Sequence, residues 1–470
     1  AGSVYITAQF RGVIDANPGV GVSNFYTGAN DSTDIILIKL NAGGNLLWVK
    51  QFIGSEDEAV TDIVVNTSNE LILSVYLTDS MDVNPGTAVQ LCTTDSTRMK
   101  TLVLRLNSNG NYLSSFALQH AAIRAGIDFS KIQTLCVTST NEIVVAGNFL
   151  GQVDLDTGAG QQFINQQGDS SAIFVAAYSN AGQLLWSQQI GALNTRCHVN
   201  DMSYSSNQHF YLTGSFQSTI DFDAGSGQSL LSSFSANDDA FILKLIQQGQ
   251  FDWVRQLGGV GADEGMAITI KPNEYVVVAG NFSDYVDFGM NTNSDWHQSY
   301  GGVDGFVVTL NANGIYHEGE QCGGVGDDVS TGLCQDNVNS VYTAGDFFQT
   351  CHFTTSLDSV IANANSEEVF FQRLTSCFPI QTAITLSGCH DTVNGMVYNQ
   401  SGVYYQYYAA ANGCDSILKI NYTSLQHDSI LFLNECNAIR VNGQLLDTTG
   451  VYLQQWTNVA GCDSSLEIHF

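Results

Sequence analysis

The stretch FYLTGSFQSTIDFDAGSG, residues 210–227, decides the fold class of this chain. It begins with β-branched, aromatic and small residues typical of a strand, and it ends in two acids one residue apart followed by two glycines. A similar Asp turn recurs at steps of 67, 72, 67 and 66 residues, with its first acid at Asp15, Asp82, Asp154, Asp221 and Asp287. A fixed period of this length predicts a repeat architecture.

Each repeat contains four short apolar segments, and all of them favour strands over helices. In the repeat that starts at residue 210, the later segments read FILKLIQQGQFDWVRQLGG, residues 241–259. Such segments are β-branched or aromatic and are bounded by Gly, Asn, Asp or Ser. Four antiparallel strands per unit predict an all-β chain with a β-propeller over residues 1–377, of six blades or alternatively seven. A β-solenoid and a string of small sandwiches are the competing architectures.

The succession of VYxTGxF, xDFDxGxG and DxFVxKLxxxGxxxWxxQxGG patterns resembles the "seven-bladed β-propeller" repeat family of bacterial surface and secreted proteins, common in the Bacteroidota. The resemblance covers residues 3 to 374. It implies a propeller at the cell surface or outside the cell. The second repeat departs from the pattern because YLSSFALQH, from residue 112, lacks the Trp, and the last unit lacks the Asp turn.

Two related units, residues 378–425 and 426–470, follow the propeller and end in NGCDS and AGCDS motifs. They resemble the short Cys-containing modules of large exported Bacteroidota proteins, many of them type IX secretion substrates. Units this small bury little core, so we expect β-sandwich-like modules, each with one disulfide, Cys389–Cys414 and Cys436–Cys462. The alternative is four free thiols. In the propeller, Cys322 and Cys334 flank one loop and are a further candidate pair.

The composition excludes two classes of partner. The chain has 470 residues, with 15 Lys and Arg against 45 Asp and Glu, a net charge of −30. This balance excludes nucleic acid, which needs a basic footprint, and argues against binding an anionic membrane surface. No apolar run is long enough to predict membrane insertion. The acidic surface is compatible with divalent cations, and eleven cysteines indicate an oxidising, extracellular compartment.

The Asp turns are either calcium loops or capped turns. Two of them carry a full pair of acids, Asp154 with Asp156 and Asp221 with Asp223, and these four residues are the candidate calcium ligands. The other turns have Asn or Gly in the second position, so we favour the capped turn as the shared feature. Trp48, Trp186 and Trp253 recur at one strand position, which favours packing in the core or between repeats over a ligand platform.

Three functions are compatible with these patterns. The first is a non-enzymatic extracellular structural or adhesive protein, with a propeller head and stalk-like modules, that forms part of a cell-surface appendage or fibre. Its partners would be copies or modules of the same protein. The second is a calcium-dependent surface protein that binds cell-surface glycans, and the third is a polysaccharide-acting propeller enzyme. The sequence contains no recognisable nucleophile, phosphate-binding or HExxH motif.

Overall fold

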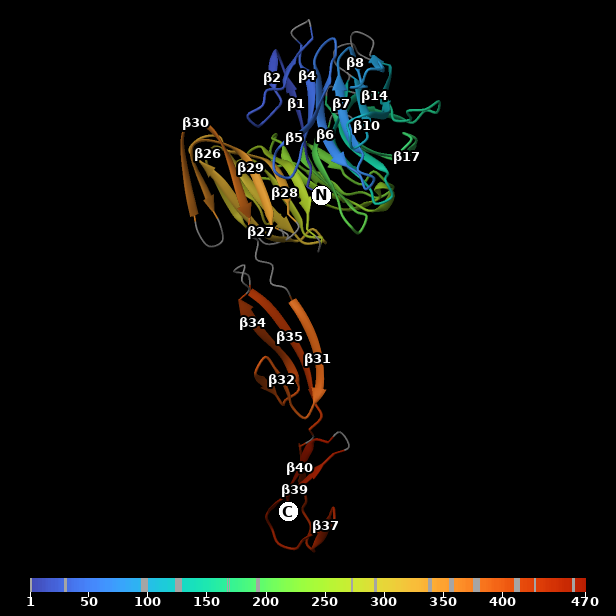
Figure 1. Ribbon diagram of the computed structural model, residues 1–470. Coiled ribbons are helices and arrows are strands. Elements are labelled where there is room, and N and C mark those ends of the chain that lie inside the picture. The colour runs from blue at the N-terminus through green and yellow to red at the C-terminus, as the bar shows by residue number, and fades with distance from the viewer. Residues whose placement is uncertain are drawn as a thin grey trace. The chain divides into compact units, whose positions relative to one another are not determined.

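A computed structural model describes residues 2–470 except 29–31, 94–99, 123–128, 167, 169, 192–194, 272–273, 291–293, 337–339, 355–358, 375–380, 410–414, 427 and 459–460. The chain divides into two compact parts, Ala1–Leu374 and Thr375–Phe470 (Figure 1). We call the first part the head. The all-β prediction is confirmed, since the described residues contain no α-helix and only one short 3-10 turn, η1 (Gln247–Gly249). No helix among them is long and apolar enough to span a membrane.

The head consists of antiparallel sheets that follow one another in chain order. Each of the first four corresponds to one sequence repeat, and the last two repeats share one sheet. We number them repeats 1 to 6. The first strands of repeats 2 to 6 are β6 (Glu58–Val65), β13 (Phe129–Val137), β18 (Arg196–Tyr204), β24 (Asp263–Ile270) and β28 (Val329–Gln335). The second strands of repeats 1 to 6 are β1 (Val4–Phe10), β7 (Leu71–Leu77), β14 (Ile143–Asp154), β19 (Phe210–Gln217), β25 (Val276–Asp287) and β29 (Val341–Thr354).

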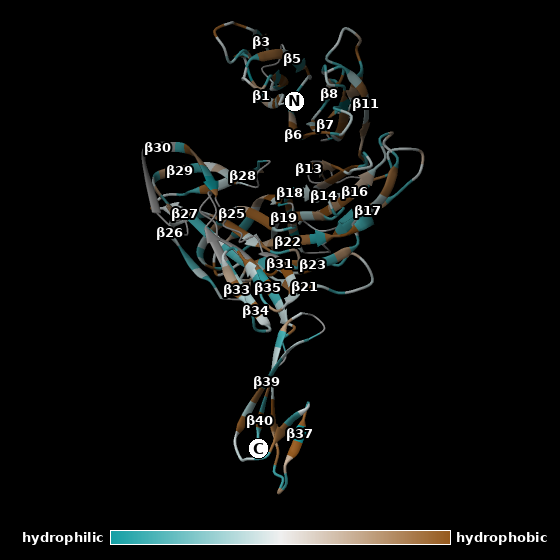
Figure 2. Cartoon of the chain, turned by 60° about the horizontal axis from the view of Figure 1, so that its bottom comes forward, coloured by the Kyte–Doolittle hydropathy of each residue, from teal (hydrophilic) through white to brown (hydrophobic). Residues whose placement is uncertain are grey.

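The outer half of each sheet is formed by a third and a fourth strand. The third strands are β4 (Asp34–Leu40), β10 (Lys100–Leu106), β16 (Ala172–Tyr178), β22 (Asp239–Leu245), β26 (Trp296–Leu310) and β30 (Ser359–Leu374). The fourth strands of repeats 1 to 5 are β5 (Leu46–Phe52), β11 (Tyr112–Ala117), β17 (Leu184–Ile190), β23 (Phe251–Leu257) and β27 (Tyr316–Gly324). In Figure 2, the central strand β25 is hydrophobic in colour and the outer strand β17 is largely hydrophilic.

Short hairpins extend the sheets between the second and third strands, and the Asp turns lie at their tips. They are formed by β2 (Val13–Asp15) with β3 (Asn24–Tyr26), β8 (Ser80–Asp82) with β9 (Leu91–Thr93), and β20 (Thr219–Asp221) with β21 (Leu230–Ser232). In repeat 3, β14 itself continues into the hairpin and pairs with β12 (Gln119–Ala122) and β15 (Phe163–Gln166).

A glycine in the second strand lets the first strand bulge toward it. A Cβ atom on Gly214 would lie 1.9 Å from the backbone oxygen of His198, where β18 has a register shift. Gly147, Gly280 and Gly345 occupy the same position in their repeats and are similarly close to the neighbouring carbonyl. The recurrent TG and AG pairs of the sequence therefore serve the backbone approach at a β-bulge.

Neighbouring first strands are linked by buried polar side chains as well as by apolar packing. The Thr134 hydroxyl lies 3.2 Å from the carboxylates of both Asp62 and Asp201. Asp62 also accepts the N–H of Leu135 at 2.7 Å, and Asp201 accepts the N–H of Ile268 at 2.8 Å. Burial, followed by the charge of Asp62, raises the pKa of Asp201 to about 6, against the opposing effect of the N–H groups that it accepts. These contacts tie repeats 2, 3, 4 and 5 into one series.

The C-terminal part contains two similar modules. The first has a three-stranded sheet of β31 (Gln381–Gly388), β35 (Asp415–Ser424) and β34 (Gly402–Ala409), with the hairpin β32 (Asp391–Val393) and β33 (Met396–Tyr398). The second has β36 (Asp428–Phe432), β40 (Asp463–His469) and β39 (Val451–Thr457), with β37 (Ile439–Val441) and β38 (Gln444–Leu446). In each module the first and last strands pair in parallel, which makes the three-stranded sheet mixed. In the first module the hairpin packs against this sheet, with Tyr398 and Ile420 in one core.

The two predicted intramodule disulfides are wrong, because Cys389 of the first module bonds to Cys462 of the second. Cys436 is exposed and carries no disulfide, and Cys414 lies outside the described residues. The bridge forms because the two modules meet at a junction that brings Cys389 and Cys462 together. The N–H of Leu425 donates to the carbonyl of Gly388, and Asn458 donates to the carbonyl of Leu425, so the ends of both sheets meet there. The bridged Cα atoms are 5.0 Å apart, a normal disulfide separation.

The expected pair Cys322 and Cys334 is not formed either, since both thiols are free. Cys322 pairs in register with Phe353 and Cys334 with Tyr342, at opposite ends of β29. The two cysteines are therefore close in sequence but not in contact. Cys92, Cys136, Cys197 and Cys351 are also free, and Cys377 lies outside the described residues.

Candidate functional site

Each Asp turn is closed by the side chain of its first acid. The Oδ1 atom of Asp221 accepts the backbone N–H of Asp223 at 3.1 Å and that of Ser229 at 2.8 Å. Contacts to the residues two and eight positions later recur at Asp15, Asp82, Asp154 and Asp287. A carboxylate that accepts two backbone N–H groups fixes such a turn by itself.

The second polar residue of the turn acts in the same way. Asp223 accepts the N–H of Gly225, and Asp156 accepts the N–H of Gly158, both at 2.8 Å. The turns therefore share a hydrogen-bonding pattern whether or not the second residue is an acid, because Asn17 and Asn84 make the equivalent contact. Among the residues that the structure describes, no three His, Cys, Asp or Glu side chains form a potential metal site. Calcium binding at Asp154, Asp156, Asp221 and Asp223 stays a prediction.

The recurrent tryptophans pack between repeats, as predicted. The indole of Trp253 in repeat 4 lies over Gly314 in the hairpin of repeat 5, and its Nε1–H donates to the carbonyl of Ala312 at 3.2 Å. Trp48 covers Gly110 and Trp186 covers Gly249 in the same manner. Only a residue without a side chain lets the ring approach the backbone so closely.

A long cationic side chain reinforces two of these contacts, and also the contact of repeat 2, where Phe116 covers Gly182. In repeat 4, Lys244 donates to the carbonyl of Ala312 at 3.4 Å. The equivalent cations, Lys39 in repeat 1 and Arg105 in repeat 2, donate to the carbonyls of Ser108 and Asn180 in the next repeat. In repeat 3 this position is Ala177, which is fully buried and cannot reach the next repeat.

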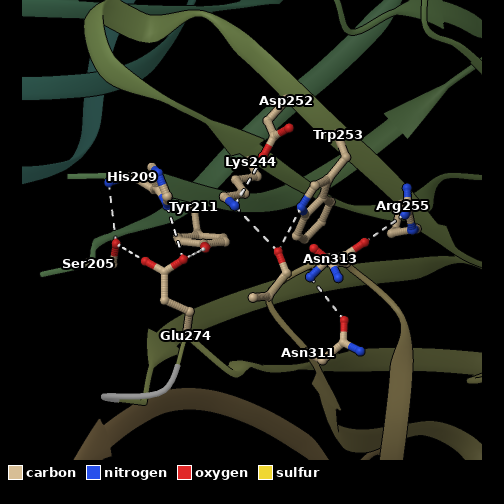
Figure 3. Close-up of polar contacts among 11 residues, drawn as sticks. Ser205, His209, Tyr211, Lys244, Asp252, Trp253, Arg255, Glu274, Asn311 and Asn313 are labelled. Atoms are coloured by element: carbon tan, nitrogen blue, oxygen red, sulfur yellow. Dashed lines mark hydrogen bonds and ion pairs between the residues drawn. The ribbon is translucent and has the colours of Figure 1, made fainter. Parts of the chain in front are cut away.

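A polar cluster occupies the space beside Trp253 (Figure 3). Oε1 of Glu274 from repeat 5 accepts the Ser205 hydroxyl at 2.6 Å, and Oε2 accepts the Tyr211 hydroxyl at 3.2 Å and lies 3.1 Å from Nδ1 of His209. A serine, a histidine and an acid meet here, but the serine hydroxyl donates to the carboxylate and not to the imidazole. The cluster thus links repeats 4 and 5 and does not form a nucleophile–base pair.

A pocket occupies the equivalent space beside Trp186, between repeats 3 and 4. Its volume is about 510 Å³. Its apolar lining is Trp186, Tyr204, Phe210 and Leu185, and its polar lining is Thr138, Thr140, Glu142, Gln208, Gln247 and Gln248. The Phe210 ring centroid lies 5.8 Å from that of Trp186 and 5.0 Å from that of Tyr204. The pocket therefore combines aromatic walls with an amide and hydroxyl rim and a single acid.

The sequence explains why the pocket is open here and filled beside Trp253. Gln208 has the turn position that Glu274 has in repeat 5, and both residues have positive φ. Glu274 reaches across to repeat 4, whereas Gln208 accepts a hydrogen bond from Gln247 within its own repeat. In addition, repeat 3 has Ala177 at the position where repeat 4 has the cation Lys244. The sequence reasoning missed this site, although AAY, residues 176–178, in place of LKL, residues 243–245 of repeat 4, was a visible signal.

Comparison with known proteins adds little. No protein-family model and no curated protein matches the chain. A Bacteroides caccae protein of unknown function has a TM-score of 0.31 and 10% identity, over 66% of this chain and 78% of its own. The extracellular domain of a B. thetaiotaomicron putative one-component system has a TM-score of 0.19 and 8% identity, over 94% and 85%. Similarities this weak carry no argument, so the functional reasoning rests on the geometry.

Proposed function

We propose that this chain is a non-enzymatic extracellular adhesion protein that binds a neutral oligosaccharide in the pocket beside Trp186. Its head would be a β-propeller of six blades, and its two C-terminal modules would belong to a stalk in a cell-surface assembly. The series of antiparallel sheets that follows the sequence repeats supports the propeller, and the disulfide Cys389–Cys462 supports an oxidising, extracellular location.

The observation that carries the proposal is the pocket lining. Aromatic side chains provide apolar surface for the C–H faces of a sugar ring, and the amides of Gln208, Gln247 and Gln248 offer both donors and acceptors to its hydroxyl groups. Among the described residues that line the pocket, Glu142 is the only acid and none is Lys or Arg. A neutral, hydroxyl-rich ligand fits this chemistry better than an anion does.

A glycan array tests the proposal directly. We expect the intact chain to bind a defined set of neutral oligosaccharides, and Gln247→Ala with Gln248→Ala to weaken that binding without loss of folding. Gln250→Ala is the matched control, because Gln250 is an exposed amide on the same segment that does not line the pocket. Equal binding by all three proteins would place the ligand elsewhere, and no binding at all would contradict the proposal.

A second variant fills the pocket and leaves its rim intact. Ala177→Lys restores the cation that repeats 1, 2 and 4 carry at this position, and the new side chain would extend toward repeat 4. We expect it to abolish sugar binding at unchanged secondary structure. An array repeated in a calcium chelator separates this pocket from a calcium-dependent glycan site, since none of the contacts described at the pocket involves a cation. Loss of binding in chelator would favour the calcium-dependent alternative.

A further inference from the structure

Pairs of buried acids recur at the boundaries between repeats, in addition to the Asp turns. Each pair combines the acid at the start of a third strand with an acid at the start of the next first strand, 24 residues later. Two such pairs are Asp34 with Glu58 and Asp239 with Asp263. All four of these residues are at most 1% exposed.

The backbone holds the two members of a pair side by side. In the second pair, the N–H of Asp263 donates to the carbonyl of Asp238, next to Asp239, at 2.8 Å. In the first pair, the N–H of Glu58 donates to the carbonyl of Thr33, next to Asp34, at 3.4 Å. The juxtaposition of the carboxylates is therefore built into the passage from one repeat to the next.

One oxygen of each aspartate in the second pair is held by donors, and the other is left without any. Oδ2 of Asp239 accepts the N–H of Phe234 and the amide of Gln256, and Oδ2 of Asp263 accepts the N–H of Gly259. The Oδ1 atoms of Asp239 and Asp263 are buried without a hydrogen-bond partner.

The first pair also has buried carboxylate oxygens that lack hydrogen-bond donors. The amide of Gln51 donates to Oδ2 of Asp34 at 2.6 Å. Oδ1 of Asp34 is buried without a partner, and the Glu58 carboxylate is buried with only the backbone N–H of Glu56 as a nearby donor. A third pair, Asp304 with Asp328, differs because both oxygens of Asp328 accept backbone N–H groups. Buried polar atoms in proteins nearly always have a partner, so the orphaned carboxylate oxygens of the first two pairs call for a bound cation or a proton.

Glycines let the carboxylates pack directly against the backbone. A Cβ atom on Gly258 would lie 2.3 Å from the carboxylate carbon of Asp239, and one on Gly54 would lie 1.6 Å from a carboxylate oxygen of Glu58. No Lys or Arg forms an ion pair with any of the four acids among the described residues. Two adjacent carboxylates buried without a counter-charge are costly unless a cation or a proton neutralises them.

We propose that the pairs Asp34/Glu58 and Asp239/Asp263 each bind a divalent cation of the calcium type. Carboxylate oxygens would supply part of the coordination, and backbone carbonyls and water the rest. The ion would join the third strand of one repeat to the first strand of the next. These sites are separate from the Asp turns, whose Oδ1 atoms already accept backbone N–H groups.

The test is the calcium content of the intact chain after dialysis against calcium and then against calcium-free buffer, with calcium alone as the probe. We expect two ions per chain in the wild type and one in Asp239→Asn with Asp263→Asn, which preserve side-chain volume. Asp221→Asn with Asp223→Asn removes the acids of one turn and should keep both ions. The wild-type measurement needs no variant, so a variant that fails to fold does not remove the test.

Two results would overturn the proposal. If no calcium is retained and calcium does not raise the melting temperature, a shared proton accounts for the pairs. If the turn variant loses an ion and the pair variant does not, calcium belongs to the turns. Sugar binding in the Trp186 pocket is scored by a different assay, so either proposal can fail without the other.

Discussion

Replacing Trp253 by alanine should destabilise the head, because the indole packs between repeats 4 and 5. The side chain is 8% exposed, covers Gly314 and donates to the carbonyl of Ala312. Truncation of a buried tryptophan costs about 3–5 kcal/mol through lost apolar contact and the cavity that remains. Loss of the indole hydrogen bond adds little to this cost, because the Ala312 carbonyl still accepts a hydrogen bond from Lys244.

Calorimetric unfolding of the intact chain measures the effect, with Trp296→Ala as the matched control. Trp296 is 58% exposed, so its truncation should change the free energy of unfolding by only about 0.5 kcal/mol or less. Trp253→Phe should fall between the two, since it retains most of the packing and loses the Nε1–H donor. Equal melting temperatures for Trp253→Ala and Trp296→Ala would refute the role of the indole as an inter-repeat contact.

Three further outcomes follow from the structure. Gly214→Ala should cost about 1–3 kcal/mol because the new methyl group meets the His198 carbonyl, whereas Gly332→Ala, with open space around it, should be nearly neutral in urea unfolding. Burial raises the pKa of Asp201 in the folded chain to about 6, above its unfolded value. The stability that this shift contributes is therefore present below about pH 4 and is lost as the pH rises through 6. Asp201→Asn should flatten that part of the curve of stability against pH. Alkylation of the unreduced native chain should modify Cys436 and spare Cys389 and Cys462, and protection of Cys436 would contradict the observed bridge.

The repeat period and the strand pattern were sufficient to predict the all-β fold and the packing of the tryptophans. Both depend on local chemistry that recurs along the chain, such as the Gly in the second strand and the Asn-Gly turn under Trp253. The single-residue differences between repeats were harder to interpret. Ala177 opens a pocket only because the neighbouring repeat also has Gln208 where another has Glu274, and that coincidence appears only when two repeats are placed in contact.

The disulfide predictions failed for a related reason. Cys389 and Cys436 occupy equivalent positions in the two modules, as do Cys414 and Cys462, so the spacing fits a bridge within a module and a bridge between modules equally well. The parallel pairing of the first and last strands decides between them, because it brings Gly388 beside Leu425 at the junction. The carboxylate pairs were not predicted from the sequence either, because the two acids of a pair are far apart in sequence and belong to different strands.

A crystal structure of the intact chain with the strongest oligosaccharide from the array tests the central claim most directly. The account predicts a sugar ring against Trp186, Tyr204 and Phe210, with its hydroxyl groups bonded to the amides of Gln208 and Gln247. A sugar bound at any other place on the head, with the pocket beside Trp186 filled by solvent alone, would contradict it.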